Sequence, residues 1–154
     1  MWPLNGHSLE AHPIAQLAPH LVPELQQHVP AIVETLQFTD GVLSHADLHG
    51  EHIFVRGSRL TGLIDFGAAF IGKRSWDFAS LAFYHGWEAA EWAIEAYAAN
   101  LDAQRQGKVE AAEIALLLAM YKLDKASTDN AQKAKIDRIV SFIELTLSHR
   151  NLKH

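Results

Sequence analysis

The chain has 154 residues, no cysteine, a formal net charge of −5 at pH 7 and 49% hydrophobic residues. This length suits a single domain, residues 1–154, with a real core, and the lack of cysteine excludes disulfides and thiolate metal sites. The apolar stretches fall far short of the ~20 residues that span a bilayer, and no signal-peptide pattern is present. We therefore expect a soluble, cytoplasmic protein with no membrane partner.

The charge is unevenly distributed along the chain. Residues 1–55 hold six acidic residues and seven of the ten histidines, but no Lys or Arg. An anionic half of this kind argues against nucleic acid as a partner. It is compatible with a divalent cation or a polycationic small molecule, although acids on solvated helix faces would give the same composition.

The first third of the chain combines an irregular start with a helical pattern. Residues 1–13 contain Pro and Gly without a sustained period and are expected to be irregular. Residues 14–39 repeat apolar side chains at three- and four-residue steps, which predicts helical structure. Pro23 and Pro30 can start or interrupt a helix, so two short helices or one kinked helix are both compatible with this segment.

Residues 42–67 are expected to form a loop and a β-hairpin. Apolar runs at residues 42–43 and 53–55 are typical of short strands. Arg56-Gly-Ser-Arg59 is expected to be the turn that joins the second run to residues 60–64.

Residues 75–149 are expected to be helical. The apolar period predicts helices over 76–84 and 87–101 separated by Gly86, followed by helices over 110–125 and 136–147. The aromatic side chains expected in the core of this half are Trp76, Phe83, Trp87, Trp92 and Tyr97. The fold class that follows is mostly α with one small β-hairpin (α+β).

The most informative motif runs from His45 to His52, His-Ala-Asp-Leu-His-Gly-Glu-His, and is followed by Leu63-Ile-Asp-Phe-Gly67. Asp47 lies between two histidines, and a held carboxylate can orient a hydroxyl group and accept its proton. Asp65 ends the second hairpin strand and can turn toward the same loop, because Gly67 permits a sharp bend. One loop carboxylate and a second from a hairpin are what phosphoryl transfer from a nucleotide needs.

The same residues are suited to Mg²⁺, which prefers oxygen ligands and keeps several waters. Asp65 is the expected carboxylate ligand. His52 is placed for a second metal contact or for a hydrogen bond to a metal-bound water. His49 and Glu51 are further candidates for contact with substrate or metal.

A different enzyme class uses the same histidines. His45, Asp47, His49 and His52 have a spacing that superficially suits zinc, which would indicate a metal-dependent hydrolase. This alternative leaves the Asp65-Phe-Gly hairpin and the Trp76-Asp77 pair without roles.

Three motifs together resemble one known family. His45-x-Asp-Leu-His-x-x-His52, Ile64-Asp-Phe-Gly67 and Trp76-Asp-Phe-Ala79 resemble the carboxy-terminal lobe of the aminoglycoside phosphotransferase family, which has a protein-kinase-like fold. Members that act on the 2″-hydroxyl of aminoglycosides are similar in having His where most members have Asn, at the position of His52. The resemblance implies ATP or GTP as co-substrate, Mg²⁺ as cofactor and a small-molecule hydroxyl as acceptor.

The resemblance also implies roles for single residues. It makes Asp47 the catalytic base or hydroxyl-positioning group, Asp65 the main Mg²⁺ ligand and His52 a metal ligand. His45, Gly67 and Asp77 become supporting residues, with Asp77 expected to hydrogen-bond the catalytic loop from a helix beneath it. From the sequence alone, Asp77 is equally well explained as an acid near a helix N-terminus.

Two departures from the family pattern affect the expected activity. No Lys or Arg and no glycine-rich loop precede Arg56, so the phosphate-gripping amino-terminal lobe is not expected within this chain. Residues 1–154 alone are therefore expected to be nearly inactive. The alternative is a pseudokinase-like binding module that docks a separate lobe or self-associates. Ala68 and the Lys73-Arg74 pair also stand where the family commonly has acids.

Overall fold

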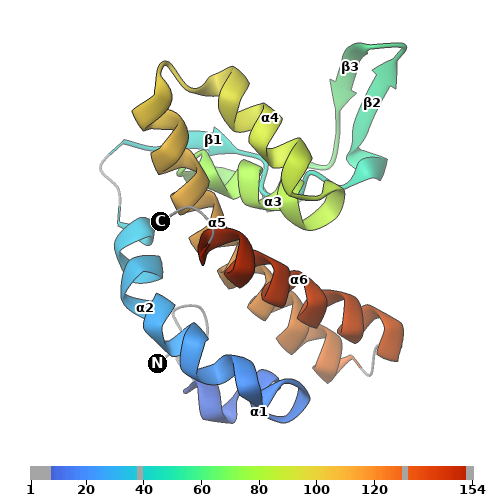
Figure 1. Ribbon diagram of the computed structural model, residues 1–154. Coiled ribbons are helices and arrows are strands. Elements are labelled where there is room, and N and C mark those ends of the chain that lie inside the picture. Colours follow the sequence, from blue (N-terminus) through green and yellow to red (C-terminus); the bar gives the residue numbers. More distant parts are fainter. Residues whose placement is uncertain (1–7, 38–39, 130–131, 152–154) are drawn as a thin grey trace. The chain divides into compact units, whose positions relative to one another are not determined.

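The structure is a computed structural model that describes residues 8–37, 40–129 and 132–151 (Figure 1). Its elements follow in chain order: η1 (Leu9–Ala11), α1 (Ile14–Leu17), η2 (Pro19–Leu21), α2 (Val22–Leu36), β1 (Val42–Ser44), η3 (Gly50–His52), β2 (Ile53–Arg56), β3 (Arg59–Leu63), η4 (Phe66–Ala68), β4 (Phe70–Gly72), α3 (Ser75–His85), α4 (Trp87–Tyr97), α5 (Leu101–Thr128) and α6 (Lys133–Asn151). The expected mostly helical fold with small antiparallel strands is confirmed.

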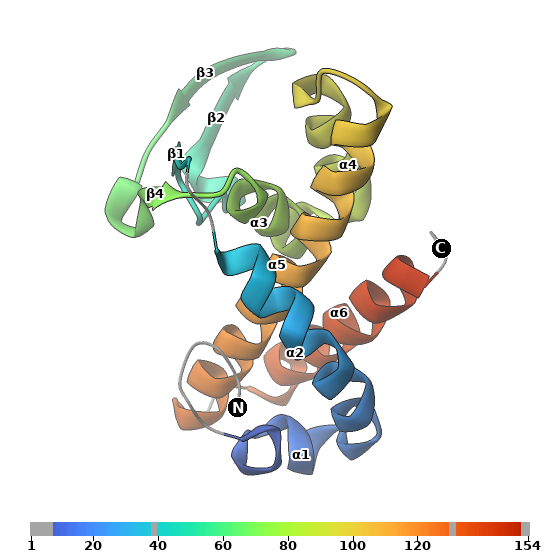
Figure 2. The same cartoon turned by 90° about the vertical axis from the view of Figure 1, so that its left-hand side faces the viewer.

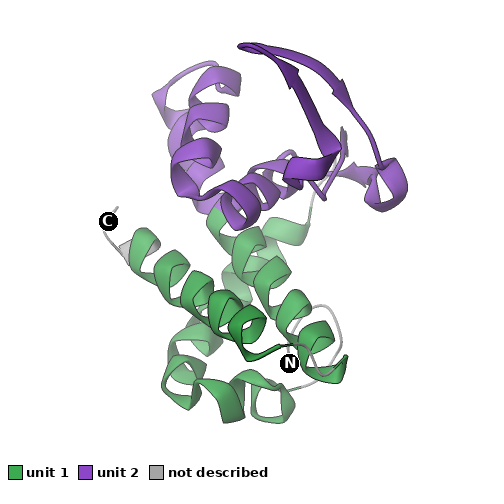
Figure 3. Ribbon diagram, turned by 90° about the vertical axis from the view of Figure 1, so that its right-hand side faces the viewer, with its two compact units in different colours: residues 1–37, 112–154 green, residues 38–111 purple. Residues whose placement is uncertain are grey.

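The chain divides into two compact units (Figure 3). Unit 1 consists of residues 1–37 and 112–154, and unit 2 of residues 38–111. Helix α5 begins in unit 2 and ends in unit 1. The expectation of a single domain over residues 1–154 stays a prediction.

Unit 1 is built from helices in its described part. Between α1 and α2 the chain passes through the 3₁₀ turn η2, and Pro23 lies in the first turn of α2, where its missing N–H is not needed. Helix α2 continues through Pro30, so the break in this segment lies at residues 18–21 and not at the second proline.

The core of unit 1 is formed around the second half of α5. Residues 112–120 are buried on every face of this helix, as expected for an element surrounded by others. His12 lies in this core, where its Nε2 donates to the Met120 carbonyl at 3.2 Å and its Nδ1 accepts from the Ile14 N–H at 3.1 Å. Both ring nitrogens are satisfied, which explains how a polar side chain is buried here.

Unit 2 contains two separate two-stranded antiparallel sheets (Figure 2). The hairpin β2–β3 turns at Gly57, whose φ of 61° requires the left-handed region. In the other sheet β1 pairs with β4, with Leu43 opposite Ile71. Strand β4 was not predicted from the sequence, because three residues without a hairpin turn to their partner carry no local signal.

The helices of unit 2 pack against one another. Gly86 separates α3 from α4 as expected, and its φ of 92° and ψ of 164° are almost confined to glycine. The first turns of α5 lie against α4, because a Cβ at Gly107 would lie 3.1 Å from Ile94 Cγ2. Helix α5 begins at Leu101, well before the predicted residue 110: the Asn100 side chain accepts from the Ala103 N–H at 2.9 Å at this end, and packing against α4 supports the first turns.

Of the five aromatic residues expected in the core, only Trp87 is buried, whereas Trp76 and Phe83 are half-buried and the other two are exposed. The side chains of Trp92 and Tyr97 are 64% and 57% exposed. Tyr97 instead packs at the surface against Phe78 and beneath the Arg74 guanidinium. Among the described residues, no helix has the length and apolar character required to cross a membrane.

Candidate active site

The motif loop of unit 2, residues 45–49, is held by side chains of α3. Asp77 Oδ1 accepts from the Ala46 N–H at 2.8 Å, and Ser80 Oγ accepts from the Leu48 N–H at 2.7 Å. His85 Nε2 donates to the Leu48 carbonyl at 2.9 Å. Loop backbone groups far from α3 in sequence are thus paired by polar side chains spaced along that helix.

Asp77 supports a loop residue with unusual backbone geometry. Ala46 has a φ of 62°, a left-handed conformation that costs a residue with a Cβ about 1–2 kcal/mol. Burial raises the pKa of the Asp77 carboxyl, and hydrogen bonds from the backbone of Ala46 and His45 oppose that rise. The hydrogen bond to the loop expected of Asp77 is present.

Asp47 is partly buried within this loop. Tyr84 Oη donates to Asp47 Oδ1 at 2.6 Å, a short distance typical of a bond to a charged acceptor. The other carboxylate oxygen, Oδ2, lies 3.9 Å from His52 Nδ1, and the Asp47 side chain is 29% exposed to solvent. One oxygen is therefore fixed by the protein while the group remains accessible.

His52 links the loop to the second carboxylate. Its Nδ1 lies 2.8 Å from the Asp47 carbonyl oxygen, and a carbonyl only accepts, so Nδ1 carries the hydrogen. In the neutral ring the lone pair then lies on Nε2, 3.5 Å from Asp65 Oδ2. Two electron-pair donors from different elements face each other here.

Asp65 has a left-handed backbone, with a φ of 60° and a ψ of 64°. Its Oδ1 accepts from the Gly67 N–H at 3.3 Å, and its side chain is 60% exposed. A Cβ at Gly67 would lie 3.1 Å from Asp65 Oδ1, so glycine allows this close approach. Non-glycine residues in this region cluster at functional sites.

His45 joins the loop to the end of the hairpin. Its buried ring donates from Nε2 to the Ile64 carbonyl at 2.8 Å and packs against Phe66, with ring centroids 4.7 Å apart. Because Ile64 precedes Asp65, this bond ties the loop to the backbone that carries the second carboxylate.

His49 and Glu51 lie at the open side of the site. His49 Nδ1 accepts from the Glu51 N–H at 3.3 Å and lies 3.8 Å from a Glu51 carboxylate oxygen, which belongs to a side chain that is 87% exposed. The His49 ring packs edge-on against Tyr84, with centroids 4.9 Å apart. Glu51 is thus available to solvent, and His49 has a packing role.

The donor set near Asp65 fits Mg²⁺. The site offers one exposed carboxylate and one imidazole nitrogen with a lone pair directed at it. Mg²⁺ is commonly held by one or two protein ligands while phosphates and water complete its shell. Asp65 and His52 therefore fit a nucleotide-bound metal better than a cage built from protein alone.

The zinc-type cluster of the hydrolase alternative is not formed. Across residues 8–37, 40–129 and 132–151, no group of three or more His, Cys, Asp or Glu side chains is arranged to hold a metal ion. His45 uses Nε2 and His52 uses Nδ1 to bond backbone carbonyls.

Sequence reasoning missed three residues that build the site. The sequence pattern assigned no site role to Ser80, Tyr84 or His85, yet each bonds the motif loop. The available signal was a polar stripe at helical spacing, since Asp77, Ser80 and Tyr84 recur at steps of three and four residues.

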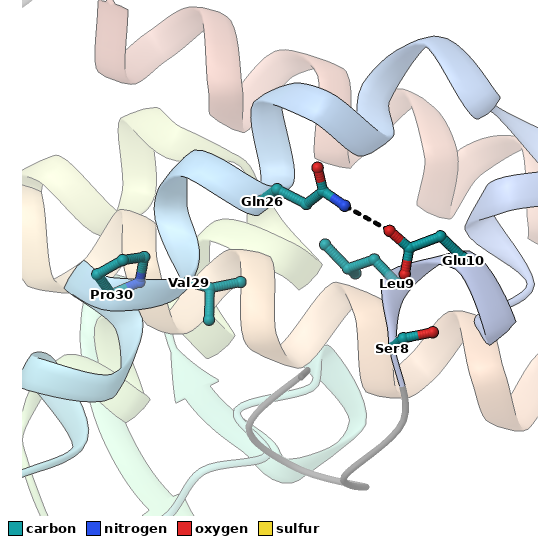
Figure 4. Close-up of a pocket in the computed structure, with 6 residues that line it drawn as sticks. All are labelled: Ser8, Leu9, Glu10, Gln26, Val29 and Pro30. Carbon is teal, nitrogen blue, oxygen red and sulfur yellow. Dashed lines mark hydrogen bonds between the residues drawn. The ribbon is translucent and has the colours of Figure 1, made fainter.

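A pocket of about 290 Å³ lies elsewhere, in unit 1 (Figure 4). Its lining residues are Ser8, Leu9, Glu10, Gln26, Val29 and Pro30. Glu10 Oε1 accepts from Gln26 Nε2 at 2.6 Å, and hydrogen bonds from its own backbone and from Ser8 lower the Glu10 pKa. None of the motif residues lines this pocket.

The fold and the loop–hairpin arrangement match the carboxy-terminal lobe of a protein-kinase-like fold. Comparison with protein families is consistent with this class: the model of the phosphotransferase enzyme family (APH) matches residues 2–118, and the chain belongs to that family. A comparison with curated proteins gave no match.

Solved structures show the same fold. The chain is similar to aminoglycoside 2'-phosphotransferase-IIIa in its GDP complex, with a TM-score of 0.72 and 18% identity over 93% of this chain and 49% of that one. A mutant of that enzyme, also in a GDP complex, gives a TM-score of 0.69 with 19% identity, over 92% of this chain and 48% of that one. The gentamicin complex of APH(2")-IIa gives a TM-score of 0.50 with 19% identity, over 84% of this chain and 46% of that one. The chain spans about half the length of these structures.

Proposed function

We propose that this chain is the catalytic lobe of a small-molecule kinase that transfers the γ-phosphoryl group of ATP or GTP to a hydroxyl group. The observation that carries the proposal is the meeting of Asp47, His52 and Asp65 in unit 2. His52 bonds the backbone of Asp47 through Nδ1 and faces the Asp65 carboxylate through Nε2. In this proposal Asp47 is the base, and His52 and Asp65 are the side chains that would bind the metal.

The residues divide the reaction between them. Asp47 orients the acceptor hydroxyl and takes its proton as the oxygen attacks the γ-phosphorus and the bond to the β-phosphate oxygen breaks. Asp65 and His52 are the side chains that would hold Mg²⁺, which, when bound, supplies positive charge to the phosphates. Asp77 and Ser80 hold the loop that carries Asp47, and the His45–Ile64 hydrogen bond holds that loop beside the backbone that carries Asp65.

The acceptor we propose is a cationic molecule, with aminoglycosides as the first class to test. The solved structures with this fold include aminoglycoside phosphotransferases, one of them bound to gentamicin. The exposed Glu51 carboxylate beside His49 offers negative charge at the open side of the site. GDP in two of these structures makes GTP a co-substrate to compare directly with ATP.

Transfer by this chain alone is expected to be slow. No Lys or Arg precedes Arg56, so this segment has no cation for the phosphates. Loss of such electrostatic stabilisation typically costs about 2.7–4 kcal/mol per group, which is 10²–10³ in rate. Nucleotide binding is therefore a better first measurement than turnover.

The test is calorimetric titration of Mg²⁺-ATP and Mg²⁺-GTP into the chain and into Asp65→Asn. Asp102→Asn is the matched control, because Asp102 is 91% exposed and pairs only at the surface with Arg105 in the part of the chain described. We expect binding in the unaltered chain and the control, and at least a tenfold weaker affinity in Asp65→Asn. Equal affinity in all three proteins would refute the metal-binding role of Asp65.

A second candidate function is a binding module that docks a separate amino-terminal lobe. The observation that favours it is the apolar exposure of the two small sheets of unit 2, where Leu43, Val55 and Ile71 are each more than 60% exposed. Two-stranded ribbons are only marginally stable without cover. Light scattering across a concentration series tests this candidate, and a monomer at every concentration with no nucleotide binding would count against it.

A further inference from the structure

We infer that the pocket of unit 1 binds a primary alkylammonium group, which the Glu10 carboxylate and the Gln26 backbone carbonyl hold against an apolar wall (Figure 4). The pocket has a volume of about 290 Å³ and is lined by residues of the short turn η1 and of helix α2. It belongs to unit 1, whereas the motif loop and the hairpin belong to unit 2. The inference is therefore independent of the proposed kinase activity.

The Glu10 side chain supplies the negative charge of the pocket. Gln26 Nε2 donates to Glu10 Oε1 at 2.6 Å, and this bond joins α2 to η1 (Figure 4). Hydrogen bonds from its own backbone and from Ser8 lower the Glu10 pKa, so the group is ionised at neutral pH. An ionised carboxylate presents two oxygens with about four lone-pair sites, which is more than these donors occupy.

Pro30 creates a second acceptor in the wall of the pocket. Helix α2 continues through Pro30, and proline has no N–H to donate to the carbonyl four residues earlier. That carbonyl belongs to Gln26, and in a helix it points along the axis toward residue 30. The Gln26 carbonyl thus lacks the donor that residue 30 supplies in a regular helix, and it lies between two residues that line the pocket.

These polar groups complement a donor that has no acceptor of its own. The Gln26 amide gives an N–H to Glu10, and Ser8 Oγ accepts from the Ala11 N–H at 3.3 Å. A primary ammonium group has three N–H donors and no acceptor, so it can bond a carboxylate and a carbonyl together. The remaining lining residues, Leu9, Val29 and Pro30, are apolar and suit the carbon chain that carries the ammonium group.

The size of the pocket limits the ligand. Its volume of about 290 Å³ falls just below the ~300–1,000 Å³ that is usual for small-molecule sites. This volume suits an ammonium group on a short alkyl chain and is too small to enclose several linked rings. A free amine and a lysine side chain share this chemistry, so the experiment compares the two.

The test is an NMR titration of the full chain labelled with ¹⁵N, with butylammonium as the main ligand. Butanol has the same alkyl chain without the charge, and tetramethylammonium has the charge without an N–H. We expect butylammonium to shift the amide signals of residues 8–10 and 26–29 with millimolar affinity, and to bind more weakly as salt is added. Butanol or tetramethylammonium binding as tightly as butylammonium would overturn the inference, and so would the absence of shifts at these residues.

Nα-acetyl-lysinamide, titrated in the same way, identifies the source of the ammonium group. Tighter binding of butylammonium supports a site for a free amine. Tighter binding of acetyl-lysinamide supports a site for a lysine side chain.

Glu10→Gln tests the carboxylate, because it keeps the shape of the side chain and removes the charge. Glu34→Gln is the matched control, since Glu34 is exposed on α2 and does not line the pocket. Glu10 is itself exposed and its charge is screened by solvent, so we expect butylammonium to bind about threefold to tenfold more weakly in Glu10→Gln. Affinity should be unchanged in Glu34→Gln, and an equal loss in both variants would overturn the role of Glu10.

Pro30→Val tests the carbonyl. The variant keeps an apolar side chain and gives residue 30 an N–H for the Gln26 carbonyl, so α2 should become more stable in thermal unfolding. Butylammonium should nevertheless bind about threefold more weakly, because the carbonyl is then already bonded. Weaker binding in a more stable variant cannot result from unfolding. An unchanged affinity in Pro30→Val would overturn the role of the Gln26 carbonyl.

Discussion

Replacing Asp77 should reveal how much of the motif loop depends on one side chain. In Asp77→Ala, the Ala46 N–H loses an acceptor at 2.8 Å and the left-handed backbone of Ala46 loses its restraint. A hydrogen bond to a charged group contributes about 1.5–3 kcal/mol, and partial exposure of Asp77 moves the expected loss toward the lower end. We expect Asp77→Ala to lower the free energy of unfolding by about 1.5–2.5 kcal/mol at pH 7.

Asp77→Asn separates the hydrogen bond from the charge. The amide oxygen still accepts from Ala46, so the loss at pH 7 should stay below about 1 kcal/mol. Burial raises the folded-state pKa of Asp77 above its ordinary 3.8, so the folded chain holds this proton more tightly than the unfolded chain. The part of the Asp77 contribution that depends on protonation is therefore complete below the ordinary pKa and falls as pH rises through the raised pKa, whereas the hydrogen bond to Ala46 persists at pH 7.

The assay is urea unfolding of the unaltered chain, both Asp77 variants and the exposed control Asp102→Asn between pH 4 and pH 8. The advantage of the unaltered chain over Asp77→Asn should shrink as pH rises from 4, and Asp102→Asn should follow the unaltered chain. Two results would refute the reasoning: an Asp77→Ala variant as stable as the unaltered chain, or an advantage over Asp77→Asn that grows with pH.

Two further predictions concern the framework around the site. Leu117→Ala removes a fully buried side chain from α5 and should lower the free energy of unfolding, measured in urea, by about 2–5 kcal/mol. Leu145→Ala, at a half-exposed position on α6, should lower it by well under half as much, and equal losses would contradict the assignment of Leu117 to the core. Gly86→Ala forces a Cβ into a backbone region almost confined to glycine and should cost about 1–3 kcal/mol, although open space surrounds the new methyl. Gly62→Ala, also in open space but without a positive φ, is its control, and thermal unfolding in which both variants match the unaltered chain would show that the Gly86 backbone is not strained.

Much of the fold could be predicted because its signals are local. The hairpin of β2 and β3 follows from two apolar runs around Arg56-Gly-Ser-Arg59, and the boundary between α3 and α4 follows from Gly86. In each case the residues that decide the structure lie within a few positions of one another, so periodicity and turn chemistry are sufficient. The motif residues Asp47, His52 and Asp65 were found in the same way, from their type and spacing.

Long-range packing decided the remaining features. Strand β4 exists because it pairs with β1, and the first turns of α5 pack against α4, where Gly107 allows a close approach to Ile94. Trp92, which its apolar character assigned to the core, is exposed because no described element covers that face of α4. Composition and periodicity say which residues prefer burial, but only the packed chain determines which of them obtain a partner.

The candidate site shows the same division between local and long-range information. The sequence by itself determined which side chains are candidates for the chemistry, because their types and spacing form motifs that can be recognised without the structure. The tertiary structure alone decided that His52 faces Asp65, that Ile64 receives the His45 hydrogen bond and that Tyr84 bonds Asp47. These partners lie 13 to 37 residues apart in the chain, a separation at which only the folding of α3 and the hairpin around the loop brings them within hydrogen-bonding reach.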